Sequence, residues 1–134
     1  MYQRVLVPTD GSDVTRRAIE HGMTIADRFD ATVHALSVRV EGPYDTPEEA
    51  QRGAEEAVSV VEAEATDAGL DVVTEIREGT PHEEILTYAE EADVDMIVMG
   101  TKGRTGIDRV IVGSVAEQVA RNADVPVVTV RVSE

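Results

Sequence analysis

Three glycines and a serine stand where an apolar segment gives way to a helical pattern, and they are the residues best suited to chemistry in this chain. They are Gly100, Gly103, Gly113 and Ser114. Glycine tolerates positive φ and carries no Cβ, so successive backbone N–H groups can face an anion together with the positive end of the following helix. The arrangement predicts a phosphate site, although a long structural loop is the alternative.

Cationic residues gather in the same stretch of an otherwise acidic chain. Lys102 is the only lysine, and Arg104 and Arg109 follow it closely. These side chains could balance the charge of a phosphate. The alternative is a solvated loop whose cations pair with local acids such as Asp108. Ser114 could donate to a phosphate and also cap its own helix.

A second polar group follows the first apolar segment and consists of Pro8, Thr9, Asp10, Gly11 and Ser12. A carboxylate at the end of a strand is well placed to accept hydrogen bonds from a ribose diol, which is the role we assign to Asp10. The alternative is a turn, because Asp followed by Gly is common there. Pro8 and Thr9 could shape a base pocket or simply end the strand. Ser12 and Asp13 are expected to cap the next helix.

Predicted strands alternate with predicted helices along the chain, and these elements must position the residues described above. Segments rich in β-branched residues predict strands over residues 4–8, 32–38, 71–77, 95–99 and 127–132, and apolar spacing predicts helices over residues 13–29, 46–68, 81–92 and 114–122. Such alternation predicts a doubly wound α/β layer around a parallel sheet. The whole chain, residues 1–134, is expected to form one domain. Ligands of such sheets bind beyond the carboxyl ends of the strands.

The acidic composition of the chain disfavours some classes of binding partner. The 134 residues include 27 Asp and Glu against 12 Lys and Arg, a formal charge of -15, which disfavours binding to nucleic acid or to an anionic membrane. A carboxylate excess with almost no lysine suits a halophilic cytoplasm, and an acidic mesophilic protein is the alternative. The chain has no cysteine and no apolar run long enough for a membrane span. We expect a cytoplasmic protein.

The glycine spacing is neither the Walker loop nor the Gly-x-Gly-x-x-Gly fingerprint. The pattern Gly100-x2-Gly103-x9-Gly113-Ser114 resembles the nucleotide-binding signature of the universal stress protein family, and residues 5–12 resemble the amino-terminal signature of that family. The order of elements, the length and the final strand agree with the family as well. The resemblance therefore covers essentially the whole chain.

The resemblance implies a Rossmann-like open sheet of five parallel strands in the order 3-2-1-4-5, with helices on both faces. It implies a homodimer joined through the final strand, which begins at Val127 and ends at Val132. Members that keep the glycine and serine signature bind ATP. By resemblance, the residues around adenine, ribose and phosphates would be Pro8, Thr9, Asp10, Val38, Met99, Gly100, Gly103, Arg104, Gly113, Ser114 and Val115. Some members carry a second hydroxyl where this chain has Ala116.

The leading hypothesis is an adenine-nucleotide-binding protein, with ATP, ADP or AMP as ligand, that serves stress response or signalling. Mg²⁺ or Mn²⁺ could accompany the phosphates, but His21, His34 and His82 lack the spacing of metal ligands. No catalytic residue is assigned, and ATP turnover is expected to be slow or absent. The alternatives are a dimerisation module that binds no nucleotide and a slow ATPase. A phosphoacceptor receiver domain is disfavoured, because no Asp ends the third strand.

Overall fold

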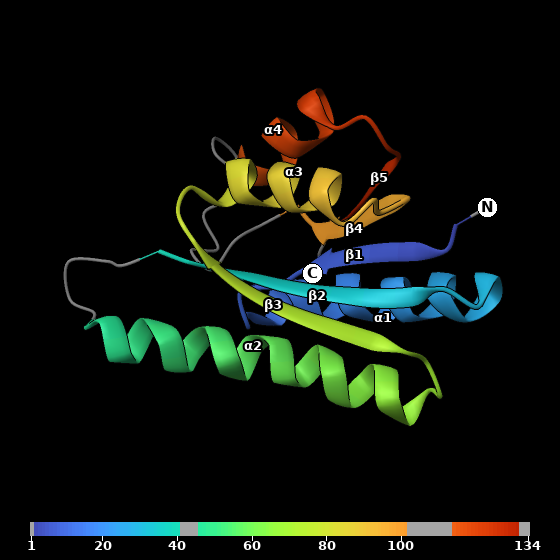
Figure 1. Ribbon diagram of the computed structural model, residues 1–134, viewed down its shortest axis with the longest axis horizontal. Helices are drawn as coiled ribbons and strands as arrows, with labels where there is room; N and C mark the ends of the chain where they lie inside the picture. Colours follow the sequence, from blue (N-terminus) through green and yellow to red (C-terminus); the bar gives the residue numbers. More distant parts are fainter. Residues whose placement is uncertain (1, 41–45, 102–113, 132–134) are drawn as a thin grey trace.

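One parallel sheet forms the centre of the protein. The computed structural model describes residues 2–40, 46–101 and 114–131. Within these ranges five strands, β1 (Arg4–Pro8), β2 (Thr32–Arg39), β3 (Val72–Glu78), β4 (Met96–Gly100) and β5 (Val127–Val130), pair in parallel in the order β3-β2-β1-β4-β5 (Figure 1). The predicted Rossmann-like topology is confirmed.

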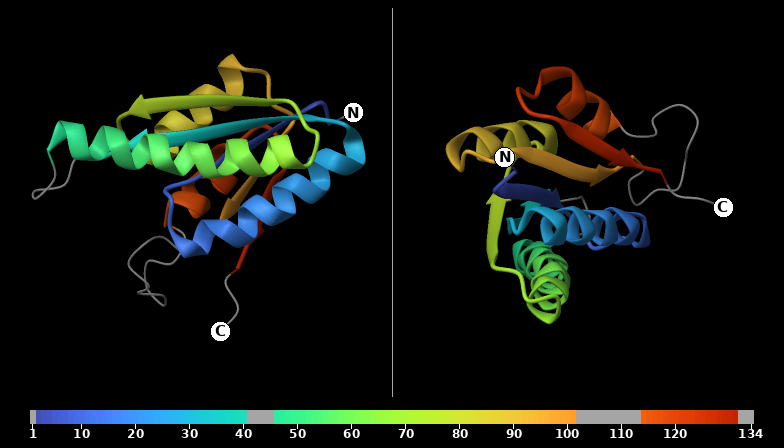
Figure 2. Two further views of the ribbon diagram at one scale, coloured as in Figure 1. Left: turned by 90° about the horizontal axis from the view of Figure 1, so that it is seen from below. Right: turned by 90° about the vertical axis from the view of Figure 1, so that its right-hand side faces the viewer.

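Helices cover both faces of the sheet. Helices α1 (Asp13–Phe29) and α2 (Pro47–Asp67) lie on one face, while α3 (Pro81–Glu91) and α4 (Ser114–Asn122) lie on the other (Figures 1 and 2). Side chains alternate along a strand, so Val5 and Val7 pack in the core under α1 and α2, whereas Leu6 packs in the core under α3 and α4. The central strands are buried on both faces, as in other parallel sheets covered by helices.

Most predicted boundaries agree with the structure to within one residue. The predicted bounds of β1, α1 and α4 are those observed. Strand β2 runs one residue further than predicted, and β3 and β4 each begin and end one residue later than predicted. The cause of the extra residue at the end of β2 and of β3 is cross-strand pairing of Arg39 with Glu78, whose side chains form an ion pair of 3.0 Å. Strand β4 begins one residue late because Asp95 accepts hydrogen bonds from the N–H groups of Gln3 and Arg4.

The final strand is shorter than the sequence predicts. Strand β5 ends at Val130, with Arg131 exposed beyond it, and Val132 lies outside the described residues. At the ends of the helices, Thr46 and Ala68 are the caps of α2, and Ala92 is the C-cap of α3. The helices predicted over residues 46–68 and 81–92 therefore included cap residues, which flank a helix and are not counted as part of it.

Helix caps explain where the site-forming helices begin. Thr46 and Glu49 form a reciprocal capping box at α2, in which the Thr46 side chain accepts from the N–H of Glu49 at 3.1 Å. Ser12 and Thr80 occupy the N-cap positions of α1 and α3, but neither makes a side-chain capping hydrogen bond. The Ser12 hydroxyl is thus left for another use.

A buried polar network holds α3 on the sheet. His34 of β2 is buried, and its Nδ1 lies 2.7 Å from the Tyr88 hydroxyl oxygen of α3. Arg77 of β3 lies over the Tyr88 ring at 5.0 Å and pairs with Glu75 and Glu91. Burial lowers the pKa of His34 and raises that of Tyr88, and the positive charge of Arg4 adds to the first effect. The network fixes the helix that begins with Pro81, at the edge of the site.

Candidate functional site

The ends of the strands open into a cavity of about 880 Å³. The chain runs from β1 outward to β2 and β3, and then returns to β4 on the other side of β1. This reversal between β1 and β4 is the topological switch point, where open α/β sheets bind ligands. Pro8 ends β1 and Gly100 ends β4, and both residues line the cavity.

The structure brings the described predicted residues together. The cavity wall contains Pro8, Thr9, Asp10, Val38, Met99, Gly100, Ser114 and Val115. These residues come from β1, β2, β4, α4 and the loop after β1, so the sheet topology unites positions more than 100 residues apart. The predicted Gly103, Arg104 and Gly113, with Lys102 and Arg109, lie outside the described residues.

The loop between β1 and α1 is a compact hydrogen-bonded turn. Thr15 Oγ1 donates to the Ser12 carbonyl at 2.8 Å and lies 3.3 Å from Thr9 Oγ1. Because the Thr15 proton is used there, Thr9 donates to Thr15 and accepts from the Gly11 N–H at 3.2 Å. Asp10 Oδ1 accepts from the Ser12 N–H at 2.9 Å. The turn interpretation of Asp10 is therefore correct, and its exposed carboxylate retains acceptor capacity for a ligand.

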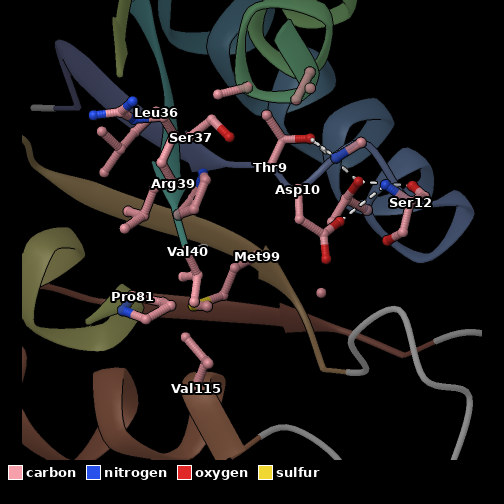
Figure 3. Close-up of a pocket in the computed structure, with 18 of the residues that line it drawn as sticks. Thr9, Asp10, Ser12, Leu36, Ser37, Arg39, Val40, Pro81, Met99 and Val115 are labelled. Atoms are coloured by element: carbon pink, nitrogen blue, oxygen red, sulfur yellow. Dashed lines mark hydrogen bonds between the residues drawn. The ribbon is translucent and has the colours of Figure 1, made fainter. Parts of the chain in front are cut away.

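Apolar side chains form the part of the cavity that faces α3 and α4. Val40, Pro81, Met99 and Val115 converge there from three different elements and the residue after β2 (Figure 3). Val40 is 56% exposed. Ala116 also lines the cavity. This half offers a surface for a flat apolar group.

Sequence reasoning missed the half of the cavity that faces α2. Its residues are Ser37 and Arg39 of β2 together with Ala50, Gly53, Ala54 and Ala57 of α2. The four small residues recur at helical spacing, which places them on one face of α2. That spacing was the available signal, but small residues at such spacing also occur at ordinary helix contacts.

Three buried polar atoms in the described residues have no hydrogen-bond partner, and all three belong to residues that line the cavity. They are Ser12 Oγ, Arg39 Nε and Thr101 Oγ1. A buried donor without a partner costs about 1–3 kcal/mol, so such groups call for a partner beyond the described residues. Their positions fit a polar ligand that spans the cavity.

Charge is unevenly distributed around the described wall. Asp10, Glu49 and Glu56 contribute carboxylates, and Arg39 contributes the one cation among the described lining residues. In the described ranges, no group of three or more His, Cys, Asp or Glu side chains could hold a metal ion. A search of the same ranges found no helix that is both long and apolar enough to cross a membrane.

The chain is similar to known proteins over nearly its whole length. The model of the universal stress protein family matches residues 1–131. A universal stress protein of Methanocaldococcus jannaschii is 40% identical, and the match covers 98% of this chain and 83% of that protein. The solved UspA of Lactobacillus plantarum is 30% identical with a TM-score of 0.82, covering 97% of this chain and 98% of that one.

A universal stress protein solved in complex with cAMP is similar in the same way. It is 29% identical with a TM-score of 0.75, and the match covers 98% of this chain and 99% of that one. The fold, the matched family model and the curated relative agree over nearly the entire length. This chain belongs to the universal stress protein family.

Proposed function

We propose that this protein binds an adenine nucleotide, ATP or a smaller adenylate, in the cavity at the carboxyl edge of the sheet. We propose further that it acts as a stress-response or signalling module through a homodimer in the cytoplasm of a halophilic cell. The observation that carries the first proposal is the convergence of eight predicted residues on one cavity. Its wall also holds buried polar atoms that have no partner among the residues the structure describes. The relative solved with cAMP supports it.

Different described residues would contact different parts of the nucleotide. Asp10 would accept hydrogen bonds from the ribose hydroxyls, since its carboxylate stands at the end of β1. Val38, Met99 and Val115 would cover apolar parts of the nucleoside. Gly100 and Ser114 would contact the phosphates, because Ser114 is the first residue of α4 and a helix N-terminus favours anions. Gly103, Arg104 and Gly113 are proposed to complete this phosphate end.

Binding rather than catalysis is the proposed activity. Phosphoryl transfer to water needs a residue that orients the water and groups that stabilise the transferred charge. Asp10 is the carboxylate that we assign to the ribose, and one of its oxygens is already engaged by the Ser12 N–H. The bound nucleotide would instead change what the protein presents to partners, by favouring one conformation over another. Slow or absent ATP turnover is expected.

Thermal unfolding in multimolar KCl tests the proposal. Ligands that bind only the folded state raise the unfolding midpoint, so ATP, ADP or AMP should raise it further with each increase in ligand concentration, roughly with the logarithm of that concentration above the Kd. Inorganic phosphate at the same concentration should raise it less, because phosphate alone leaves the base and ribose contacts unmade. If no adenine nucleotide changes the midpoint of the folded protein, the proposed function is wrong, and a dimerisation module without nucleotide becomes the better hypothesis.

A further inference from the structure

Thr15 is a buried polar residue to which the proposed function gives no role. It lies in the first turn of α1 and is 8% exposed. Ala18 and Ile19 follow it by three and four residues, so they share its face of the helix, and both belong to the apolar core. A hydroxyl on such a face is costly to bury unless it is hydrogen-bonded. The partners of this hydroxyl therefore indicate what it does.

The Thr15 hydroxyl contacts both sides of the turn that contains Asp10. Its Oγ1 donates to the Ser12 carbonyl at 2.8 Å and lies 3.3 Å from Thr9 Oγ1. A hydroxyl has a single proton, so Thr15 accepts from Thr9 while it donates to Ser12. Thr9 directly precedes Asp10, and Ser12 follows it by two residues. One buried hydroxyl therefore joins the residues on either side of Asp10.

The direction of the Asp10 carboxylate depends on Ser12. Asp10 is exposed, and its side chain makes one hydrogen bond to the described residues, in which Oδ1 accepts from the Ser12 N–H at 2.9 Å (Figure 3). The carbonyl of Ser12 is held twice by Thr15, through the hydroxyl at 2.8 Å and through the backbone N–H at 3.2 Å. Thr15 thus fixes the residue that orients the carboxylate.

We propose that Thr15 is a positioning residue that holds the Asp10 carboxylate in the orientation in which it accepts hydrogen bonds from the ribose hydroxyls. The inference rests on the proposed function, since it concerns the ribose acceptor of that same nucleotide site. An acceptor that is fixed before the ligand arrives loses less conformational freedom on binding. The Thr15 proton is spent on Ser12, so Thr15 acts through Thr9 and Ser12 and donates nothing to the ligand.

Calorimetric titrations with AMP and with 2′,3′-dideoxy-AMP, which lacks both ribose hydroxyls, test this role. Thr15→Val keeps the shape of the side chain and removes the hydroxyl, so it should weaken AMP binding about fivefold. It should leave the affinity for the dideoxy ligand unchanged, because that ligand makes no bond to Asp10. The preference of the wild type for AMP is thereby reduced. Thr15→Ser restores the hydroxyl and should bind AMP within about twofold of the wild type.

A matched control lies on the same helix. Thr24 is exposed, lies outside the cavity wall and donates to the Glu20 carbonyl at 3.1 Å, so Thr24→Val removes a similar hydrogen bond and should leave AMP binding unchanged. Circular dichroism verifies the fold of each variant. If Thr15→Val does not fold, Thr15→Ala takes its place, because alanine suits a helix best.

Three results overturn the inference while the proposed function stands. They are a Thr15→Val variant that binds AMP as tightly as Thr24→Val, a Thr15→Val variant that weakens both ligands by the same factor, and a Thr15→Ser variant that binds AMP as weakly as Thr15→Val. If the wild type binds no adenine nucleotide, the proposed function itself fails and the inference falls with it.

Discussion

At the scale of single residues, Asp10 combines a structural and a proposed binding role. Its Oδ1 closes the turn after β1 by accepting from the Ser12 N–H at 2.9 Å, which leaves the rest of the carboxylate for a ligand. A charged acceptor makes a stronger hydrogen bond than a neutral one. The two roles can be separated by an amide, which keeps the acceptor oxygen and removes the charge.

Asp10→Asn is therefore expected to keep the turn and weaken AMP binding about tenfold, because it removes the charge-assisted bond to the ribose hydroxyls. Calorimetric titration measures the change. Asp30→Asn is the matched control, since Asp30 is exposed and its φ of 54° suits asparagine equally well. Equal AMP affinity in Asp10→Asn and wild type would show that Asp10 serves only the turn.

The residues predicted from the sequence are those whose local spacing carries information. Asp10 and Gly11 form a recognisable turn, and Ser114 begins a recognisable helix. Ser37, Arg39 and Gly53 could not be found in this way, because their proximity depends on how α2 packs across β2. Each looks ordinary in its own segment. Only the packing shows that Arg39 has a buried donor with no partner in the described part of the chain.

At the scale of elements, Gly22 of α1 and Gly53 of α2 differ in whether the packing leaves room for a side chain. Gly22→Ala should destabilise the protein, because the new Cβ meets the fully buried and β-branched Val7 and overpacking costs about 1–3 kcal/mol. Gly53→Ala should stabilise it by about 0.5–1 kcal/mol, since the Cβ enters open space within a helix. Unfolding free energies in urea measure both. Changes of the same sign would contradict this distinction.

The His34 and Tyr88 pair links α3 to the sheet in a way that depends on pH. The pKa of His34 in the folded protein lies below the ordinary 6.5, so the unfolded chain takes up the proton first as the pH falls. The stability gained from neutral His34 is complete above 6.5, declines as the pH falls through 6.5, and is lost below the lowered pKa of the folded state.

His34→Asn removes this titration and keeps a polar atom near the position of Nδ1. The advantage of the wild type over the variant in unfolding free energy should thus be largest above pH 6.5 and shrink below it. Urea titrations on both sides of that pH measure the difference. A constant or growing advantage at lower pH would mean that His34 is not held in its neutral form.

Element boundaries were predictable where local chemistry sets them. The capping box of Thr46 and Glu49 marks the start of α2, and the apolar run of β4 is plain in the sequence. The extra residues of β2 and β3 arise from the pairing of Arg39 with Glu78, which are far apart along the chain. The residue pattern of a single segment cannot predict a contact between two residues that are distant in the sequence.

At the scale of the whole molecule, the two edges of the sheet differ. Strand β3 carries Glu75, Arg77 and Glu78, and charges on an edge strand oppose pairing with another chain. Strand β5 is uncharged from Val127 to Val130, and its Val127 and Val128 are only partly buried. An uncharged edge is the better surface for a symmetric partner. The proposed homodimer would therefore form through β5.

If the proposed homodimer forms through β5, Thr129→Lys should convert it to a monomer, because the substitution places a charge on the exposed side of β5. Sedimentation equilibrium in multimolar KCl determines the mass in solution. Val73→Lys, on the exposed side of the opposite edge strand, is expected to leave the dimer intact. A monomeric wild type, or a dimer lost equally in both variants, would argue against the β5 interface.

The central claim is that the cavity between β1 and β4 binds an adenine nucleotide. Calorimetric titration of the folded wild type with AMP and with ATP in multimolar KCl tests it most directly. We predict saturable binding of one nucleotide per chain, with a sub-millimolar Kd for at least one of the two ligands. No detectable heat or saturation with either, in protein whose fold is verified by circular dichroism, would contradict the account.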